Sequence, residues 1–410
     1  MLGIRNGFVA AVLLFWPAML LAQGTVTIYG TVTDPSGAAI AGAKVTVTNT
    51  ATDQNRETVS AVDGNYVVPD LRVGTYRLSV TASGFKTFVQ ESIQVQVDEN
   101  RRVPVQMAVG GVNESVTVAA DVAQVETRSS ALRQVVDSAR IIELPLNGRN
   151  PLQLQYLVAG SSGSTDPAGG QSENTSVSID GMRANSNNYS LDGADNQDPF
   201  FNTPSVFPNP DALEEFSLQT SNYSAELGRN AGAVMNAVTR SGSNSLRGTV
   251  FEFLRNQDFD ARNFFANSVS PFKRNQFGGT TGGPIRKDKT FFFGSYQGTR
   301  VNSEPGTQTP IVLTAAQRTG DFGGAKSIKD PLTGNPFPNN IIPASRLSPA
   351  SLNFMNAFVP LPNAANSIFT FPNEQTTVDD QAVAKIDHTV TSTNHLSGRL
   401  IYERNNTKDL

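Results

Sequence analysis

The chain has 410 residues, a formal net charge of -4 and 17% charged residues, so it can form two or three domains but lacks the clustered lysine and arginine that nucleic-acid binding needs. It contains no cysteine and two histidines, which excludes disulfide frameworks, thiol nucleophiles and the common zinc sites. Asparagine, serine, threonine and glycine are abundant instead, a profile typical of a β-rich envelope protein with polar turns.

Residues 1–22 are expected to form a secretory signal peptide. Arg5 precedes an apolar run that extends from Phe8 to Ala22, contains Pro17 and is too short to cross a bilayer. Cleavage is expected after Ala22, and the absence of cysteine excludes lipoprotein processing. No later stretch approaches the roughly 20 apolar residues of a membrane-spanning helix, so membrane insertion would have to use β-strands.

Residues 24–108 alternate apolar and polar side chains in short runs, which predicts half-buried strands. Turn sequences at Asp34–Gly37, Asp63–Asn65 and Ser83–Gly84 separate the runs at the spacing of a seven-stranded sandwich. The stretches GTVTDPSGAAIAGAKVTV and DGNYVVPDLRVGTYRLSVTASGF resemble the carboxypeptidase regulatory-like domain, a transthyretin-like sandwich. Despite the name of that family, the resemblance implies no catalytic groups, and none are present in this stretch.

Residues 109–120 are interpreted as a linker that contains a candidate partner-binding strand. An acidic residue, a hydroxyl residue and alternating valines follow one another in Glu114, Ser115, Val116, Thr117 and Val118. This pattern resembles the TonB box, an extended peptide that adds itself as a strand to the edge of a partner sheet. The alternative is that the segment is the first strand of the next domain or a linker strand.

Residues 121–240 are interpreted as a plug domain. A helix stop at Pro145 and a turn at Asn147–Gly148 are predicted, and the Ser/Gly-rich residues 160–170 are expected to form a loop. Ser190–Gly193 reads SLDG, and three further segments follow it in order: Ala212–Phe216, Gly228–Gly232 and Val234–Thr239.

This order resembles the plug of TonB-dependent outer-membrane receptors, which has a Leu-Asp-Gly turn, a short helix leading into a strand, a glycine-rich crossover and a final Val-x-Asn-x-Val-Thr strand. Asp180–Arg183 departs from the usual arginine-glycine pair before the first turn. The LPLNGRN string at residues 144–150 is similar to that of the Oar-like group, whose members carry a sandwich in front of the plug.

Residues 245–410 show the spacing of a transmembrane β-barrel. Strands are predicted at residues 246–254, 276–285, 290–300, 381–390 and 396–404, and a long extracellular loop is predicted at residues 330–372. In the last hairpin, Ala384 and Ile386 alternate with Lys385 and Asp387, as expected for lipid-facing and lumen-facing positions. The predicted fold is therefore mainly β, with a sandwich, an α+β plug and the first strands of an incomplete barrel.

Enclosing such a plug takes on the order of 22 strands of about 10 residues each, which the residues after Asn244 cannot supply. We therefore expect the chain to be the amino-terminal part of a longer receptor.

Two groups of plug residues are candidate sites. Ligand contacts are expected where aromatic rings adjoin acidic and amide groups, at Tyr189, Asp192, Asp195, Asn196, Phe200 and Phe201. The aromatic residues could equally form a small hydrophobic core. Polar contacts between plug and barrel are expected at Arg229, Arg240 and Glu226, with solvated surface as the alternative. The acidic residues lack the spacing of a dedicated calcium loop, so no metal site is expected.

The favoured hypothesis is an outer-membrane receptor that binds an unidentified extracellular ligand and imports it with energy delivered by the TonB complex. Its expected surroundings are outer-membrane lipid, with the sandwich in the periplasm. The alternative is an envelope structural or adhesion protein that uses the sandwich as an interaction module. An enzyme is not expected, because neither His388 nor His395 is part of an evident catalytic constellation, and no cofactor or nucleic acid is implied.

Overall fold

The computed structural model describes residues 26–111, 114–118, 130–163, 177–200, 202–224, 227, 231–262, 264, 269–304, 307–324, 326–392 and 394–409. The expected signal peptide and most of the expected loop at residues 160–170 lie outside the described residues. The chain divides into two compact units. The first comprises residues 1–252, 276–298 and 379–404, and the second comprises residues 253–275, 299–378 and 405–410.

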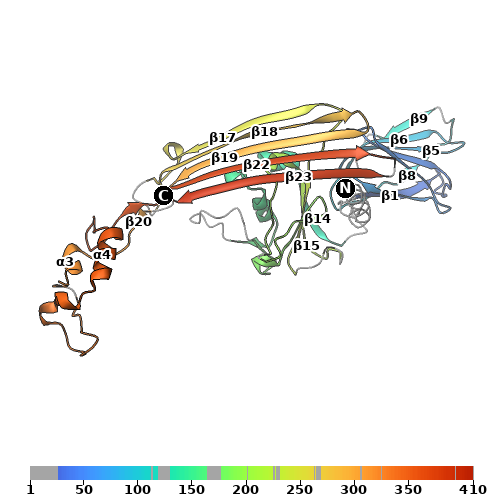
Figure 1. Cartoon of the computed structure of the whole chain (residues 1–410). Helices are drawn as coiled ribbons and strands as arrows, with labels where there is room; N and C mark the ends of the chain where they lie inside the picture. The colour runs from blue at the N-terminus through green and yellow to red at the C-terminus, as the bar shows by residue number, and fades with distance from the viewer. Residues whose placement is uncertain are drawn as a thin grey trace, which may run out of the picture. The chain divides into compact units, whose positions relative to one another are not determined.

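The first unit begins with a β-sandwich, drawn in blue and cyan in Figure 1. Its strands are β1 (Val26–Thr33), β2 (Lys44–Asn49), β3 (Asn55–Val59), β4 (Asn65–Leu71), β5 (Gly74–Thr81), β6 (Thr87–Val95), β7 (Asn100–Arg102), β8 (Val105–Gln106) and β9 (Ser115–Val118). One sheet has the order β4-β1-β7, with β8 also paired to β1, and the other has the order β3-β2-β5-β6-β9. The predicted sandwich is therefore confirmed.

The alternation of the sequence produces the sandwich core. Val26, Ile28 and Val32 of β1 are fully buried, and they pack with the inward residues of the facing sheet. Gly30 lies on the same strand at a close approach of two backbone segments, and a Cβ atom there would come within 2.0 Å of the Val103 carbonyl oxygen. The buried hydroxyl of Tyr66 donates a 2.6 Å hydrogen bond to that same oxygen, so this hydroxyl is satisfied in the core.

The plug follows the sandwich. Its strands are β10 (Leu132–Asp137), β11 (Ser161–Ser162), β12 (Ser178–Ile179), β13 (Asn188–Leu191), β14 (Ala194–Asp195), β15 (Leu213–Ser221) and β16 (Val234–Thr239). Its helical segments are α2 (Ser138–Glu143), η2 (Asn147–Arg149), η3 (Pro151–Leu157), η4 (Ala184–Ser186) and η5 (Pro210–Ala212). The main sheet has the order β10-β15-β16-β13-β14, and β11 pairs with β12.

The local sequence explains the plug elements. Helix α2 begins after Asp137, whose carboxylate accepts a hydrogen bond from the Arg140 backbone N–H, and it ends before Pro145 as predicted. Strand β15 is buried on both faces: Phe216 and Leu218 belong to the plug core, whereas Glu215, Ser217 and Gln219 face the other way. This second face carries polar groups, and it is the face that contacts the sandwich.

Five long strands follow the plug and lie side by side in Figure 1. They are β17 (Arg247–Asn256), β18 (Phe272–Arg286), β19 (Thr290–Ser303), β22 (Gln375–Thr389) and β23 (His395–Asp409), paired in that order. All five predicted strands are present, and four of them extend well beyond the predicted bounds. Lys385 and Asp387 are buried, whereas Ile386, Leu400 and Tyr402 are exposed, which agrees with the predicted alternation.

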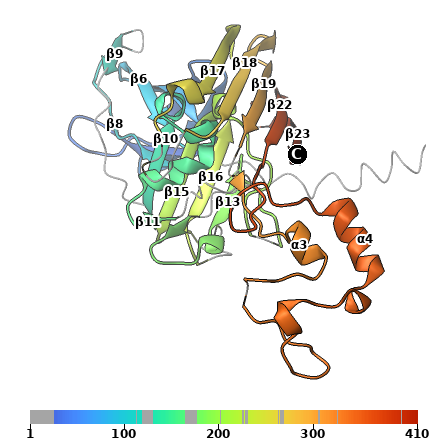
Figure 2. The same cartoon turned by 90° about the vertical axis from the view of Figure 1, so that its left-hand side faces the viewer.

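The second unit contains the segment between β19 and β22, seen in orange in Figure 2. Its elements are β20 (Thr307–Gln308), α3 (Ala315–Arg318), η7 (Pro338–Asn340), η8 (Ala344–Arg346), α4 (Pro349–Phe358) and β21 (Phe371–Pro372), and η6 (Gln257–Phe259) also lies in this unit. The long loop predicted at residues 330–372 therefore has helical structure of its own. Among the described residues, no helix is both long enough and apolar enough to cross a membrane.

Arg318 organises this segment. Its side chain is only 8% exposed, and it donates hydrogen bonds to the backbone carbonyls of Leu313, Met355, Val359 and Pro360. Carbonyls at the end of a helix have no partner within the helix, so a guanidinium with several donors is well suited to satisfy those that end α4. A single buried cation therefore connects α3 to the carboxyl end of α4.

Candidate functional site

The Leu-Asp-Gly turn of the plug contacts the barrel strands through Asp192. This residue has φ 52° and is followed by Gly193 at φ 78°, a turn geometry that aspartate and glycine tolerate. The Asp192 carboxylate forms an ion pair with Arg399 of β23 and lies 3.8 Å from Lys385 Nζ of β22. It also accepts 2.7 Å hydrogen bonds from the Thr239 backbone N–H and hydroxyl. The turn, the last plug strand and two barrel strands therefore meet at one carboxylate.

A second contact centres on Arg149, from the LPLNGRN string. Its guanidinium forms a buried ion pair with Asp211 of the plug, and its Nε donates a 3.3 Å hydrogen bond to Gln297 Oε1 of β19. The guanidinium carbon also lies 4.5 Å from the centre of the Phe251 ring of β17. Burial lowers the pKa of Arg149 and raises the pKa of Asp211, while the attraction between the two groups opposes both changes.

A third contact is uncharged. The Asn209 backbone N–H donates a 2.6 Å hydrogen bond to Gln381 Oε1 of β22, and Asn209 Nδ2 lies 3.0 Å from Ser295 Oγ of β19. Gln381 Nε2 donates to the Phe207 carbonyl at 2.9 Å. All of these groups except the Phe207 carbonyl belong to residues that are less than 9% exposed. The segment before η5 is thus fixed to the barrel by amide and hydroxyl groups.

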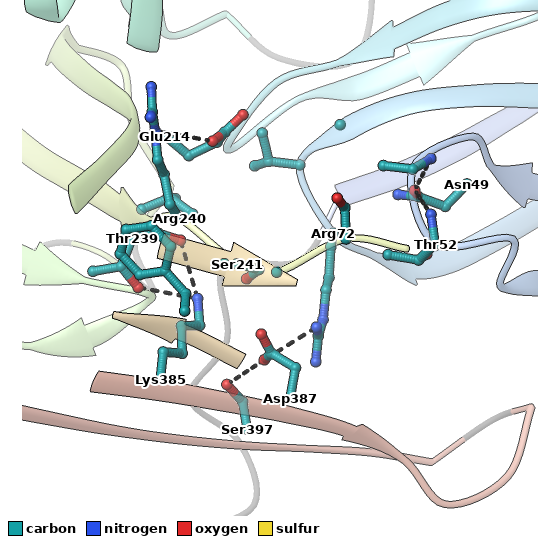
Figure 3. A pocket seen from close by; sticks show the side chains of 18 of the residues that line it. Asn49, Thr52, Arg72, Glu214, Thr239, Arg240, Ser241, Lys385, Asp387 and Ser397 are labelled. Carbon is teal, nitrogen blue, oxygen red and sulfur yellow. Dashed lines mark hydrogen bonds and ion pairs between the residues drawn. The ribbon is translucent and has the colours of Figure 1, made fainter. Parts of the chain in front are cut away.

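A cavity of about 1510 Å³ lies beside the first contact. Figure 3 shows Arg72 from the sandwich, Thr239 and Arg240 from the plug, and Lys385 and Asp387 from β22 around it. Lys385 Nζ donates 3.0 Å hydrogen bonds to the Thr239 carbonyl and hydroxyl. Polar groups of the sandwich, the plug and the barrel therefore border one cavity that is large enough for water. Water there can take the place of a hydrogen-bond partner when one of these parts moves.

The sandwich contacts the plug through the turn that follows β6. Val97 of this turn is fully buried, and its N–H donates a 2.7 Å hydrogen bond to Glu215 Oε2 of β15. The Asp98 carboxylate accepts hydrogen bonds from Gln219 Nε2 at 3.1 Å and from Asn236 Nδ2 at 3.0 Å. Burial raises the pKa of Glu215 to about 7, with neighbouring carboxylates adding to the rise and the Val97 N–H opposing it.

The candidate TonB box lies at the edge of the sandwich. Residues Ser115–Val118 form β9, which pairs in parallel with β6 in the register Thr87↔Ser115, Phe88↔Val116, Val89↔Thr117 and Gln90↔Val118. Glu114 Oε2 lies 2.6 Å from Lys86 Nζ, an ion pair that is partly exposed on both sides. The segment is therefore an extended strand, as the sequence predicts, but it belongs to the sandwich sheet rather than to the plug or to a free linker.

The expected ligand contacts differ in their surroundings. Tyr189 is 1% exposed and belongs to the plug core, one of the two roles that the sequence leaves open, and Asp192 is bound to barrel strands. Asn196 Nδ2 donates to the Val206 carbonyl, Asp195 pairs with Ser190 between β14 and β13, and Phe200 is 85% exposed. Phe201 lies outside the described residues. Of the expected aromatic contacts that the structure describes, Tyr189 is buried and Phe200 is exposed to solvent.

The expected plug–barrel contacts are described only in part. Arg229 and Glu226 lie outside the described residues. Arg240 borders the cavity, donates to the Leu213 carbonyl at 3.2 Å, and lies 3.7 Å from Glu214 Oε2, so its contacts are within the plug.

Sequence reasoning missed the residues that hold the plug against the barrel strands. These are Arg149, Asn209, Asp211, Gln297, Gln381, Lys385 and Arg399, and Asp192 was assigned to ligand contact instead. One usable signal was present: Lys385 and Arg399 stand at lumen-facing positions of the alternating hairpin, where a charge needs a partner. The partner itself could not be identified, because Asp192 lies 207 positions from Arg399 in the chain.

The solved structures that resemble the chain include two bacterial proteins. The outer membrane transporter YddB from Escherichia coli aligns with a TM-score of 0.45 and 13% identity, over 67% of this chain and 33% of its own. The siderophore receptor PirA from Acinetobacter baumannii aligns with a TM-score of 0.39 and 15% identity, over 68% of this chain and 32% of its own.

Sequence comparisons are more specific. Residues 27–108 match the model of the carboxypeptidase regulatory-like domain, and residues 238–409 match the model of an outer membrane beta barrel domain. The TonB-dependent transporter Oar of Myxococcus xanthus is 30% identical over 304 residues, which is 71% of this chain and 28% of the length of that relative. The chain thus spans less than a third of the curated relative. With its sandwich in front and outer-membrane strands behind, it belongs to the Oar-like group of TonB-dependent outer-membrane receptors.

Proposed function

We propose that the protein is a receptor that binds an extracellular ligand and imports it when a periplasmic TonB complex pulls on the strand Ser115–Val118. The observation that carries this proposal is the nature of the plug–barrel contact. Asp192, Lys385 and Arg399 hold the plug through ion pairs and hydrogen bonds beside a cavity of about 1510 Å³. Polar partners of this kind can be exchanged for water, which lowers the cost of moving the plug away from the barrel strands.

The position of β9 supports the same proposal. An extended strand at a sheet edge has unpaired backbone groups on its outer side and is suited to strand addition by a partner. In the described part of the chain, β9 pairs with β6 and with no second strand. An envelope adhesion protein, the competing hypothesis, has no need of an accessible strand at this place.

Site-specific crosslinking distinguishes the two hypotheses. The chain has no cysteine, so Ser115→Cys introduces the only thiol and can be crosslinked to a cysteine in the strand-forming region of TonB in intact cells. Val59→Cys is the matched control, because Val59 is 64% exposed on β3, at the opposite edge of the same sheet. A receptor is expected to crosslink in the Ser115→Cys variant and not in the Val59→Cys variant. Equal crosslinking of both variants, or none of Ser115→Cys, would favour the adhesion hypothesis.

A further inference from the structure

We propose that the pull of the partner reaches the plug through the sandwich: β9 passes it to β6, and the turn that follows β6 passes it to plug strands β10, β15 and β16. This inference rests on the proposed function and identifies the route by which that function would work. It assigns a mechanical role to the sandwich, which otherwise has no evident part in transport.

The first link is the pairing of β9 with β6. The Thr87 N–H donates a 2.8 Å hydrogen bond to the Glu114 carbonyl, and four residue pairs follow in register. Val116 stands opposite Phe88, which is 8% exposed and part of the sandwich core. The strands are seen next to each other in both Figure 1 and Figure 2. A pull along the axis of β9 is directed across the hydrogen bonds to β6, so it acts on all of them together.

The free side of β9 follows from the same hydrogen bond. In a strand, successive residues direct their backbone N–H and C=O groups to opposite sides. The Glu114 carbonyl is directed to β6, so Val116 and Val118 also direct their backbone groups to β6, whereas Ser115 and Thr117 direct theirs outward. A partner strand can therefore bind Ser115 and Thr117 while β9 stays on the sandwich, and this extends the sheet by one strand.

The second link is the turn of residues 96–99, which directly follows β6. Four polar contacts join it to three plug strands: Val97 N–H to Glu215, the Val97 carbonyl to Arg133 Nη1 at 3.0 Å, and the Asp98 carboxylate to Gln219 and Asn236. Val97 is fully buried in this contact. Strand β6 is thus bound to β9 along one edge and to the plug at its carboxyl end.

The sandwich contacts the barrel strands differently. The Arg72 side chain pairs with Asp387 of β22, and the Gln54 side chain donates a hydrogen bond to the Thr389 hydroxyl of the same strand. Arg72 is partly exposed and both residues border the cavity, so water can reach the two groups once the contact opens. We therefore expect the sandwich to separate from the barrel strands and to remain attached to the plug when β9 is pulled.

Asp98→Gly interrupts this route at one point. It removes the acceptor of both the Gln219 and the Asn236 hydrogen bonds, and glycine keeps the backbone geometry because Asp98 has φ 60°. The matched control is Ser92→Gly, an exposed residue of β6 with φ 59°. Asp98→Asn keeps the shape and one acceptor oxygen, and it is expected to give an intermediate result.

Three single cysteine substitutions, each in a chain with no other thiol, read out the steps in intact cells. Ser115→Cys reports partner binding by crosslinking. Ser295→Cys reports the departure of the plug from the barrel, because Ser295 is 6% exposed and bonded to Asn209. Ser217→Cys reports separation of sandwich from plug, because Ser217 is fully buried on the β15 face that carries Glu215 and Gln219.

When the membrane is energised, the thiol of Ser295→Cys is expected to become reactive towards a soluble maleimide. This should hold in the otherwise unchanged chain and also when the control substitution Ser92→Gly is present. With Asp98→Gly this rise should be lost although Ser115→Cys still crosslinks. The thiol of Ser217→Cys should stay unreactive in the otherwise unchanged chain.

An equal rise at position 295 with Asp98→Gly would overturn the route, as would energy-dependent labelling at position 217. Absence of the crosslink from Ser115→Cys in the otherwise unchanged chain would instead refute the proposed function, and the inference with it.

Discussion

The Arg72 guanidinium lies 3.1 Å from Asp387 Oδ1 and thereby joins the loop between β4 and β5 of the sandwich to strand β22. The Asp387 side chain is 3% exposed, and Oδ1 also accepts a 2.7 Å hydrogen bond from the Ser397 hydroxyl. A buried carboxylate of this kind depends on its cationic partner, since removal of one member of a buried pair leaves an uncompensated charge.

Arg72→Ala should therefore weaken the contact between the sandwich and the barrel strands, by on the order of 2 kcal/mol because Arg72 itself is partly exposed. A short bismaleimide between Gln54→Cys and Thr389→Cys measures the contact, since these two side chains are hydrogen-bonded to each other. Arg77→Ala, on exposed β5 surface, serves as the control. Unchanged crosslinking in Arg72→Ala would show that this ion pair does not hold the sandwich in place.

The Arg149–Asp211 pair should be one of the strongest single contacts of the plug. Arg149→Ala is expected to cost about 3 to 5 kcal/mol of unfolding free energy, because it leaves Asp211 buried without its cation. The double variant Arg149→Ala/Asp211→Ala should cost clearly less than the sum of the two single variants. Urea titration followed by circular dichroism measures this coupling, and additive losses would contradict it.

Arg149→Lys tests the geometry of the same contact separately. Lysine keeps the charge but lacks the planar group that contacts Asp211, Gln297 and the Phe251 ring together. We expect a smaller loss than in Arg149→Ala, of about 1 to 2 kcal/mol. A lysine variant as stable as the unchanged chain would mean that charge alone matters at this position.

Glu215 should make the stability of the plug depend on pH. Its pKa is raised by burial from 4.5 to about 7, so between these values the folded state binds the proton more tightly than the unfolded state. Stability should therefore fall as the pH rises from about 4.5 to 7, by an amount on the order of 3 kcal/mol.

Glu215→Gln keeps an acceptor for the Val97 N–H and removes the titration, so it should flatten this part of the pH profile. Glu143→Gln, on an exposed position of α2, should leave the profile unchanged. Urea midpoints measured at the acidic and the alkaline side of this range are sufficient for the comparison. A profile of Glu215→Gln that matches the unchanged chain would show that another group is responsible.

Proline substitutions at two neighbouring positions distinguish the two edges of β9. Thr117→Pro removes an outward-directed N–H and should abolish the TonB crosslink while β9 stays on β6. Val116→Pro removes an N–H directed to β6 and should release the strand from the sandwich, which protease accessibility of residues 114–118 measures. If Thr117→Pro crosslinks as well as the unchanged chain, the partner does not use the outer edge.

Arg318 provides a test in the second unit. Arg318→Met keeps an extended, unbranched side chain but removes the guanidinium donors to the four carbonyls, so the segment around α4 should become sensitive to limited proteolysis. Lys326→Met, at an exposed position of the same unit, is the control. Equal resistance of both variants would show that apolar packing alone maintains this segment.

The elements of the fold were largely predictable because they depend on local patterns. Period-two alternation located the sandwich and all five barrel strands, and Pro145 marked the end of α2. The helical structure of α4 within the predicted long loop was missed. The proline-rich sequence of this stretch does not indicate that Arg318 will bind the backbone carbonyls at the end of a helix there.

The site was less predictable because it depends on contacts between distant segments. Asp192 and Arg399 are 207 positions apart, and Asn209 and Gln381 are 172 apart, so no local pattern connects them. Strand β9 was recognised from its sequence, but its pairing with β6 depends on which sheet edge is free in the folded sandwich. The buried position of Tyr189 likewise follows from the packing of the plug core rather than from its neighbours in sequence.

The displacement of the plug by an energised partner is tested most directly by the reactivity of a thiol at position 295. Ser295→Cys is placed in the full chain, and maleimide labelling is compared in cells with TonB, in cells without TonB, and in cells treated with a protonophore. We expect rapid labelling only in energised cells that contain TonB, because Ser295 is otherwise covered by Asn209 of the plug. Equal labelling under all three conditions would contradict the account.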